Sequence, residues 1–135
     1  APVGPGVNPN TIFPTFVNKA LHGDDLVLSG KGTRIQTYVH ARDIAAALYL
    51  ALKSDNAHGV YNLSSYNAVS NYELAELCIK LLKSNSKILF NNKEDIMDDY
   101  VWDVSLERIK RDIGYEPSIS IEESIIEYSE YLKNI

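Results

Sequence analysis

The amino-acid sequence predicts a small mixed α/β (α+β) domain in which short strands alternate with amphipathic helices. Two Ser-x-x-Glu capping boxes, Ser70 to Glu73 and Ser120 to Glu123, mark helix starts ahead of apolar periodic runs. Short apolar or alternating runs lie between the helical stretches and predict strands. With 135 residues and no internal repeat, the chain is long enough for one domain, residues 1–135, with a modest core.

The first part of the chain predicts a turn, a helix and a strand. The Gly-Pro-Gly run at 4–6 enforces a turn. Apolar residues at helical spacing predict a helix over 11–22, and Gly23 is a suitable residue to end it. A short strand over 26–29 follows, closed by the Gly-Lys-Gly turn of 30–32.

Residues 34–40 alternate in polarity and predict a second strand with Arg34, Gln36 and Tyr38 on one face. The two glycines before it serve a turn and not a dinucleotide loop, because Ile35 stands where that loop needs a third glycine. A guanidinium on a polar strand face is matched to phosphate oxygens. A solvated strand arginine is the other interpretation of Arg34, and at this point both stay open.

Residues 42–53 predict a strong helix. Ile44, Leu48 and Leu52 form an apolar stripe expected to face the core, and Asp43 complements the helix N-terminus. We therefore interpret this helix as an element that packs on the core.

Tyr49 and Lys53, in the same helix, have a Tyr-x-x-x-Lys spacing that can hold a proton-transfer pair on one helix face. A match of this length is common by chance, and no dinucleotide fingerprint precedes it. We therefore interpret the pair as part of the packing helix.

The second half continues the alternation. It predicts a buried strand over 59–63, a helix over 70–83 and a strand over 87–90. Ser105 can cap a short helix that stops at Gly114, and a last helix begins after the second capping box.

Composition excludes several classes of function. Thirteen basic and eighteen acidic residues give a net charge of −5, so a broad surface for nucleic acid or an anionic membrane is not expected. No apolar run approaches the roughly 20 residues that span a bilayer. One cysteine, Cys78, excludes an internal disulfide and predicts a reducing, cytoplasmic setting. The start at Ala1, in a turn sequence, predicts a piece of a longer parent protein.

Metal binding is not predicted. His22, His40 and His58 lie on different elements, without the Cys or carboxylate spacing of a metal site. The acidic stretch 94–99 lacks the glycine and the ligand alternation of a calcium loop, so we expect a solvated loop there.

Several segments, taken in order, resemble the NAD-dependent epimerase/dehydratase family of extended short-chain dehydrogenases/reductases. Ala-Pro-Val-Gly-Pro-Gly at 1–6 is similar to that family's Asn-Val-Tyr-Gly-Pro-Gly segment. Residues 30–45 resemble its Gly-x-Gly-x-x-x-Arg-x-Phe-Val-x-Val-x-Asp-x-Ala segment. Further matches are Gly59–Leu63 followed by Ser70 and Glu73-Leu74, then Asp103–Ser105, Ile113–Pro117 and Ile121–Ile125.

The resemblance implies the C-terminal substrate-binding part of an NAD(P)-dependent nucleotide-sugar epimerase or dehydratase, similar to UDP-glucose 4-epimerase. It implies an upstream Rossmann domain that binds NAD or NADP, a nucleotide-diphosphate sugar as substrate, and a homodimeric parent. The catalytic Tyr-x-x-x-Lys would precede Ala1, so this chain alone is expected to be inactive.

The resemblance also assigns site residues. Leu28 and Ser29 fall where the family's strand lines the nucleotide base, and Pro2 and Val3 match the segment that borders the nicotinamide.

Two positions concern the diphosphate. The family's arginine in the polar strand aligns with Gln36, and Arg34 on the same strand face could restore the lost charge. A second family arginine aligns loosely with Lys93, a point charge without the guanidinium fork.

Two other hypotheses come from different classes of function. One is a non-catalytic relative that uses the same cleft as a ligand or redox sensor. The other is a stand-alone interaction module, which predicts a well-packed apolar surface in place of the cleft.

Overall fold

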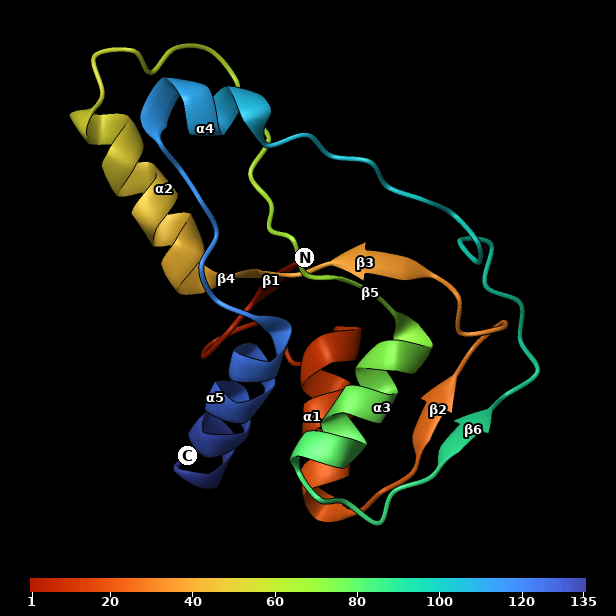
Figure 1. Cartoon of the computed structure of the whole chain (residues 1–135). Coiled ribbons are helices and arrows are strands. Elements are labelled where there is room, and N and C mark those ends of the chain that lie inside the picture. Colours follow the sequence, from red (N-terminus) through yellow and green to blue (C-terminus); the bar gives the residue numbers. More distant parts are fainter.

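The computed structural model describes all residues, 1–135, and has a mixed α/β fold as predicted (Figure 1). The chain forms five helices and six short strands, and none of the helices is long and apolar enough to cross a membrane. In chain order the elements are β1 (Pro2–Val3), α1 (Ile12–His22), β2 (Leu26–Leu28), β3 (Ile35–Thr37), β4 (Val39–His40), α2 (Ala41–Lys53), β5 (Ala68–Ser70), α3 (Asn71–Leu81), β6 (Ile88–Phe90), α4 (Glu107–Ile113) and α5 (Ile121–Lys133).

The strands form three separate two-stranded sheets. The pairs β1 with β4 and β2 with β6 are parallel, whereas β3 and β5 are antiparallel. Parallel pairing places the carboxyl ends of β2 and β6 at the same edge, so the loops that leave both strands start there. Paired residues include Val3 with His40, Leu28 with Phe90, and Gln36 with Val69.

The main core lies where α1, α3 and α5 pack on one another and on the short strands (Figure 1). Phe13 is at its centre, with its ring 5.8 Å from the rings of both Tyr38 and Tyr128. Leu74 and Ile125 are fully buried beside them. This core fixes β2 and β3 relative to the helices.

A second, smaller core joins α2 to α4 at the other end of the molecule (Figure 1). Tyr115 is buried there, and its hydroxyl donates a hydrogen bond to the carbonyl of Ser64 at 2.8 Å. The buried carboxylate of Asp43 ties α2 to the segment before α5, because it accepts hydrogen bonds from both backbone amides of Ser118 and Ile119 and from the Ser118 hydroxyl. Asp43 therefore does more than complement the helix dipole.

Most of the predicted helix ends agree with the structure, with two exceptions. Helix α4 begins at Glu107 with Leu106 as its N-cap residue, and Ser105 only accepts a hydrogen bond from the Glu107 amide at 3.3 Å. Helix α3 ends at Leu81, two residues before the predicted end. Ser70 and Ser120 both form complete capping boxes with the glutamate three residues later. Gly23 and Gly114 end α1 and α4 in the left-handed conformation. Helix α2 is capped by His40, whose Nδ1 accepts from the amide of Arg42 at 3.1 Å.

Two strand predictions need correction. Residues 59–63 form no strand, because the segment pairs with no other strand and is held by side chains instead. The Tyr61 hydroxyl donates to Asp112 at 3.0 Å, and the Arg108 guanidinium lies 4.9 Å from its ring centre. The predicted strand 34–40 is divided at Tyr38, whose side chain turns into the main core.

The prediction for the packed face of α2 was also wrong. Leu48 and Leu52 are 61% and 87% exposed, and the helix packs through Asp43 and Ala47 instead. The apolar residues Ala45, Leu48, Tyr49 and Leu52, at i, i+3, i+4 and i+7, are left as an exposed face that we call the α2 stripe.

Candidate functional site

An open pocket of 470 Å³ lies where the end of β2, the polar edge of β3 and the first turns of α1 and α3 meet; we call it the Arg34 pocket. It brings together Leu28, Ser29, Arg34 and Gln36, which the resemblance assigned to substrate binding. The other lining residues are Asn10, Thr11, Ile12, Thr15, Phe16, Val27, Asn71 and Asp95.

The turn between β2 and β3 positions these side chains. Leu28 is buried and anchors the strand end, while the Ser29 hydroxyl accepts a hydrogen bond from the Asn91 amide at 3.0 Å. The chain then reverses, and Arg34 and Gln36, two residues apart, project on the same side of β3. The pocket therefore presents one cation, Arg34, and one carboxylate, Asp95, beside several neutral hydrogen-bonding groups.

Gln36 has the most central position. Its side chain lines the Arg34 pocket and also two neighbouring pockets of 420 and 320 Å³. Its amide lies 3.5 Å from the Asn71 side-chain oxygen, so the group is only lightly held. Pro2 lines the 320 Å³ pocket together with Gln36 and Tyr38.

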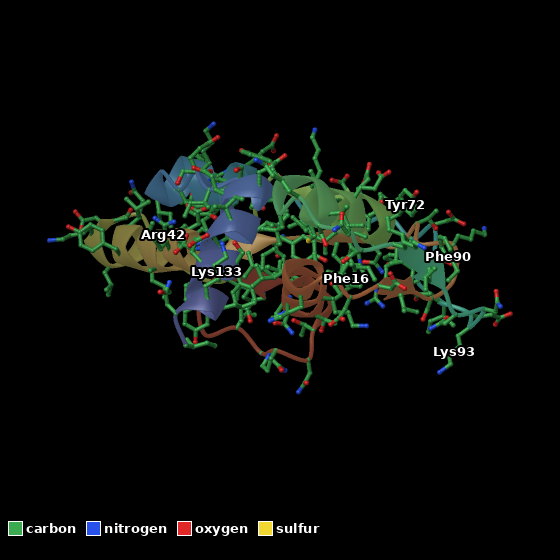
Figure 2. The ribbon with its side chains drawn as sticks, turned by 90° about the horizontal axis from the view of Figure 1, so that it is seen from below. Phe16, Arg42, Tyr72, Phe90, Lys93 and Lys133 are labelled. Carbon is green, nitrogen blue, oxygen red and sulfur yellow. The ribbon has the colours of Figure 1, made fainter.

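The other two predicted residues lie elsewhere. Val3 is buried in the main core and lines none of these pockets. Lys93 lies beyond β6 on the rim of a separate acidic pocket of 510 Å³, and its side chain points away from the body of the molecule (Figure 2). The structure therefore does not bring Lys93 to the Arg34 pocket.

Asp95 is a pocket residue that the sequence interpretation missed. Its Oδ1 lies 3.7 Å from the Arg34 guanidinium, and the two side chains are 13% and 39% exposed, respectively. The sequence holds a signal for it: if 26–29 and 87–90 pair in parallel, the loops after both strands meet at one edge. Treating 94–99 as a solvated loop overlooked that geometry.

Residues 94–99, the acidic loop, are fastened to the 30–33 turn. The Asp98 carboxylate accepts from the Lys31 amide at 2.7 Å and the Thr33 hydroxyl at 3.2 Å. Lys31 also pairs with Asp99 at 2.8 Å, and this hydrogen bond lowers the pKa of Asp99. Gly30 is required here, because a Cβ on it would lie 2.0 Å from the Asp98 carboxylate.

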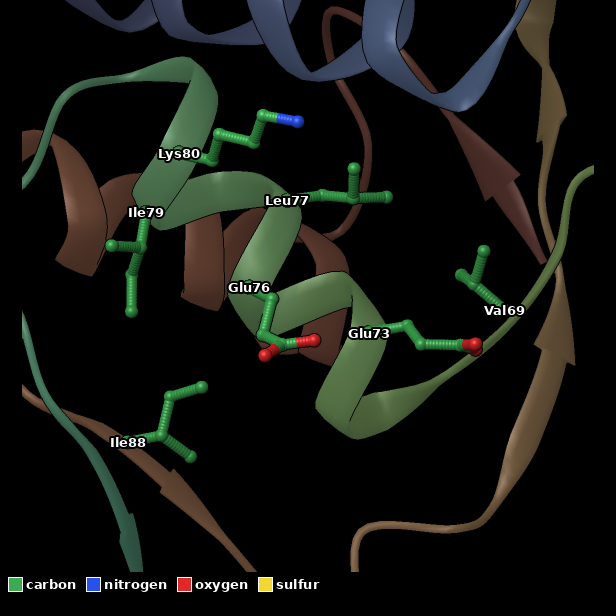
Figure 3. Close-up of a pocket in the computed structure, with 7 residues that line it drawn as sticks. All are labelled: Val69, Glu73, Glu76, Leu77, Ile79, Lys80 and Ile88. Atoms are coloured by element: carbon green, nitrogen blue, oxygen red, sulfur yellow. The ribbon is translucent and has the colours of Figure 1, made fainter.

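The largest pocket, of 710 Å³, is a groove along α3 (Figure 3). Much of its wall is apolar, from Val69, Leu77, Ile79 and Ile88. Glu73 is already used in the α3 capping box, and the only cation, Lys80, stands with two carboxylates. The groove therefore offers less to an anionic ligand than the Arg34 pocket does.

The side chains of the Arg34 pocket are suited to binding a ligand. A guanidinium, a hydroxyl and side-chain amides can hold a phosphoryl or sugar group, and no three His, Cys, Asp or Glu side chains gather to hold a metal ion. The fold and this pocket together define a small α/β domain with a polar ligand site at the junction of its sheets and helices.

Comparison with known proteins agrees with the resemblance seen in the sequence. Residues 1–64 match the model of the NAD dependent epimerase/dehydratase family. The dTDP-glucose 4,6-dehydratase of Escherichia coli is 27% identical over 139 residues, which cover 97% of this chain and 38% of that protein. The low-salt glycan biosynthesis protein Agl12 of Haloferax volcanii is 25% identical, covering 90% and 39%. The chain thus spans about two fifths of the length of these curated relatives.

Solved structures show the same fold. The UDP-glucose 4-epimerase of Thermotoga maritima, solved with UDP-glucose, matches with a TM-score of 0.87 at 20% identity, over 98% of this chain and 43% of that one. The dTDP-glucose 4,6-dehydratase of Bacillus anthracis, solved with NAD, matches with a TM-score of 0.80 at 23% identity, over 99% and 42%. The resemblance to the NAD-dependent epimerase/dehydratase family is confirmed, and the chain corresponds to one region of such proteins.

Proposed function

We propose that this chain is the nucleotide-sugar-binding part of an NAD(P)-dependent epimerase or dehydratase, and that it is inactive alone. The observation that carries the proposal is the Arg34 pocket, which joins Leu28, Ser29, Arg34 and Gln36 in a chain with the fold of such enzymes. Relatives whose names specify dTDP-glucose and UDP-glucose as substrates support a nucleotide-diphosphate sugar as the ligand.

In this proposal each pocket residue has a binding role. The Arg34 guanidinium donates to a phosphoryl oxygen, and Gln36 donates or accepts where the sugar and the phosphate meet. Leu28 and Ser29 border the nucleotide base. The residues hold the sugar in one orientation, which lowers the entropy cost of the reaction at a site built by the rest of the parent.

NAD or NADP, when bound, would supply the hydride transfer that such sugar chemistry needs. Two of the solved structures that match this chain were determined with a cofactor bound, one with NAD and one with NADPH. This chain fits only the edge of such a site: Pro2 lines a 320 Å³ pocket next to Gln36, whereas Val3 is buried and faces the core. Most cofactor contacts therefore belong to another part of the parent protein.

The partner of this chain in the proposal is an upstream Rossmann domain of the same parent. Parallel sheets are normally larger and covered on both faces, yet the β1/β4 pair has two residues in each strand. Helix α2 follows β4 directly and exposes the α2 stripe. Parallel strands of the upstream domain, added beside the β1/β4 pair, would extend this sheet. The α2 stripe could then pack on the face of the extended sheet. A cytoplasmic, homodimeric parent completes the proposal.

Calorimetric titration tests the binding role. UDP-glucose and dTDP-glucose are titrated into the chain and into Arg34→Ala, with Arg111→Ala as the matched control, because Arg111 is exposed on α4 and does not line the pocket. We expect Arg34→Ala to weaken binding about tenfold or more and Arg111→Ala to leave it unchanged. Equal affinities for the wild type and Arg34→Ala would remove Arg34 from the site.

An activity assay tests the remainder. With NAD present, the chain alone should convert no sugar nucleotide, whereas the full parent should. Turnover by the chain alone would contradict the proposal. A parent that binds the sugar nucleotide without converting it, and lacks an upstream Tyr-x-x-x-Lys, would favour the non-catalytic sensor.

A further inference from the structure

We propose that Asp95 is a specificity-determining residue that holds down the affinity of the Arg34 pocket for multiply charged phosphate groups. The inference rests on the proposed function, because it concerns the same pocket. Its basis is that the only cation lining the pocket already has an anionic partner inside it.

The position of Asp95 is fixed by its loop. Its Oδ1 accepts the amide of Met97 at 3.0 Å while it faces Arg34 at 3.7 Å. Asp98 and Asp99 fasten the same loop to Lys31. The carboxylate is thus held next to the guanidinium and is not a mobile surface group.

The charges explain the expected selectivity. The Asp95 carboxylate is largely buried, so salt screens its field less than that of a surface group. A phosphoryl group that binds Arg34 comes within a few ångströms of this carboxylate and is repelled by it. The repulsion grows with the charge of the ligand, so UDP is penalised more than UMP.

The main test uses UDP and UMP as probes and compares the wild-type chain with Asp95→Asn. Asparagine keeps the shape and the oxygen that accepts from Met97, and it removes only the charge. We expect UDP to bind about tenfold more tightly to Asp95→Asn, and UMP about threefold more tightly. Glu94→Gln is the control, because it removes the same charge one residue away on a side chain that does not line the pocket, and it should change either affinity less than twofold.

Each outcome decides the matter. If the wild type binds UDP and Asp95→Asn binds it equally or more weakly, the inference on Asp95 fails and the proposed function stands. If no variant binds UDP at millimolar concentration, both fail. An equal gain in Glu94→Gln would assign the effect to overall charge and also overturn the inference. Should Asp95→Asn not fold, Asp95→Ser, whose hydroxyl can also accept from Met97, repeats the test under the same criteria.

Discussion

Tyr38 carries a buried hydroxyl without a hydrogen-bond partner, at the centre of the main core. Burial raises the pKa of this hydroxyl, which therefore stays neutral. An unpaired buried hydroxyl costs free energy, whereas the phenyl ring of Tyr38 packs well on Phe13. Tyr38 also interrupts the strand, so a single residue links the core to the edge of the pocket.

We predict that Tyr38→Phe raises the free energy of unfolding by about 1 kcal/mol, because it removes an unsatisfied group and keeps the ring. Tyr115→Phe is the matched control, since its buried hydroxyl donates to Ser64 and its loss should lower stability by about 1 kcal/mol. Urea unfolding of both variants measures the two values. Destabilisation by Tyr38→Phe would mean that its hydroxyl has a partner.

Cys78 predicts how stability changes in alkali. Burial raises the pKa of its thiol from 9.0 to about 12. The contribution of this thiol to the free energy of unfolding is complete below pH 9 and is lost as the pH rises toward 12. The reason is that, between these pH values, the thiol ionises easily only in the unfolded chain. We expect the unfolding free energy to fall by about 1.4 kcal/mol per pH unit from this group, and the slope to flatten in Cys78→Ala. Urea midpoints at pH 8 and pH 10 measure it, and an unchanged slope would contradict the assignment.

At the scale of elements, the helices were easier to predict than the strands. Capping boxes and terminal glycines are local signals, and they located α1, α3 and α5 well. Strands depend on distant partners: the apolar run 59–63 found none, while 68–70 became β5 because Gln36 lies opposite Val69. The prediction of the inward face of α2 was wrong for a similar reason, because the second core contacts Ala47 and Leu50 and leaves Leu48 and Leu52 exposed.

The capping box of α5 gives a prediction in acid. The hydrogen bonds from Ser120 lower the pKa of Glu123 below 4.5, so its contribution is present above pH 4.5 and is lost as the pH falls through the lowered value. Glu123→Ala should therefore lower the melting temperature at pH 7 and show a smaller further loss at pH 3. Glu122→Ala, in the same helical turn but outside the capping box, is the control. Equal losses of melting temperature in the two variants at pH 7 would show that the capping box does not stabilise α5.

At the scale of the whole molecule, the candidate site was partly predictable. Strand alternation put Arg34 and Gln36 on one side, and the resemblance added Leu28 and Ser29; these four residues line one pocket. The sequence alone could not show that Asp95 lines this pocket and Lys93 does not. The positions of both residues depend on how the acidic loop folds back on the 30–33 turn. Their assigned roles in ligand binding stay predictions.

The α2 stripe makes a prediction about association. Leu52→Lys should leave the unfolding free energy of this chain within about 0.5 kcal/mol of the wild type, because the side chain is exposed. It should reduce self-association of the chain in sedimentation and weaken docking of any domain that covers the stripe. Leu50→Lys is the control: Leu50 packs against the second core, so this variant should be strongly destabilised. A large loss of stability in Leu52→Lys would show that the stripe is already covered.

The parallel pairing of β2 with β6 has a consequence for the order of events during folding. It joins segments that are 62 residues apart, as the Ser29–Asn91 and Asp25–Lys87 contacts show. Closing so long a loop costs entropy before any contact compensates for it, whereas the helices form from local contacts. The wall of the Arg34 pocket should therefore be completed late, after the helical core has formed, and ligand binding should appear as the last phase of refolding.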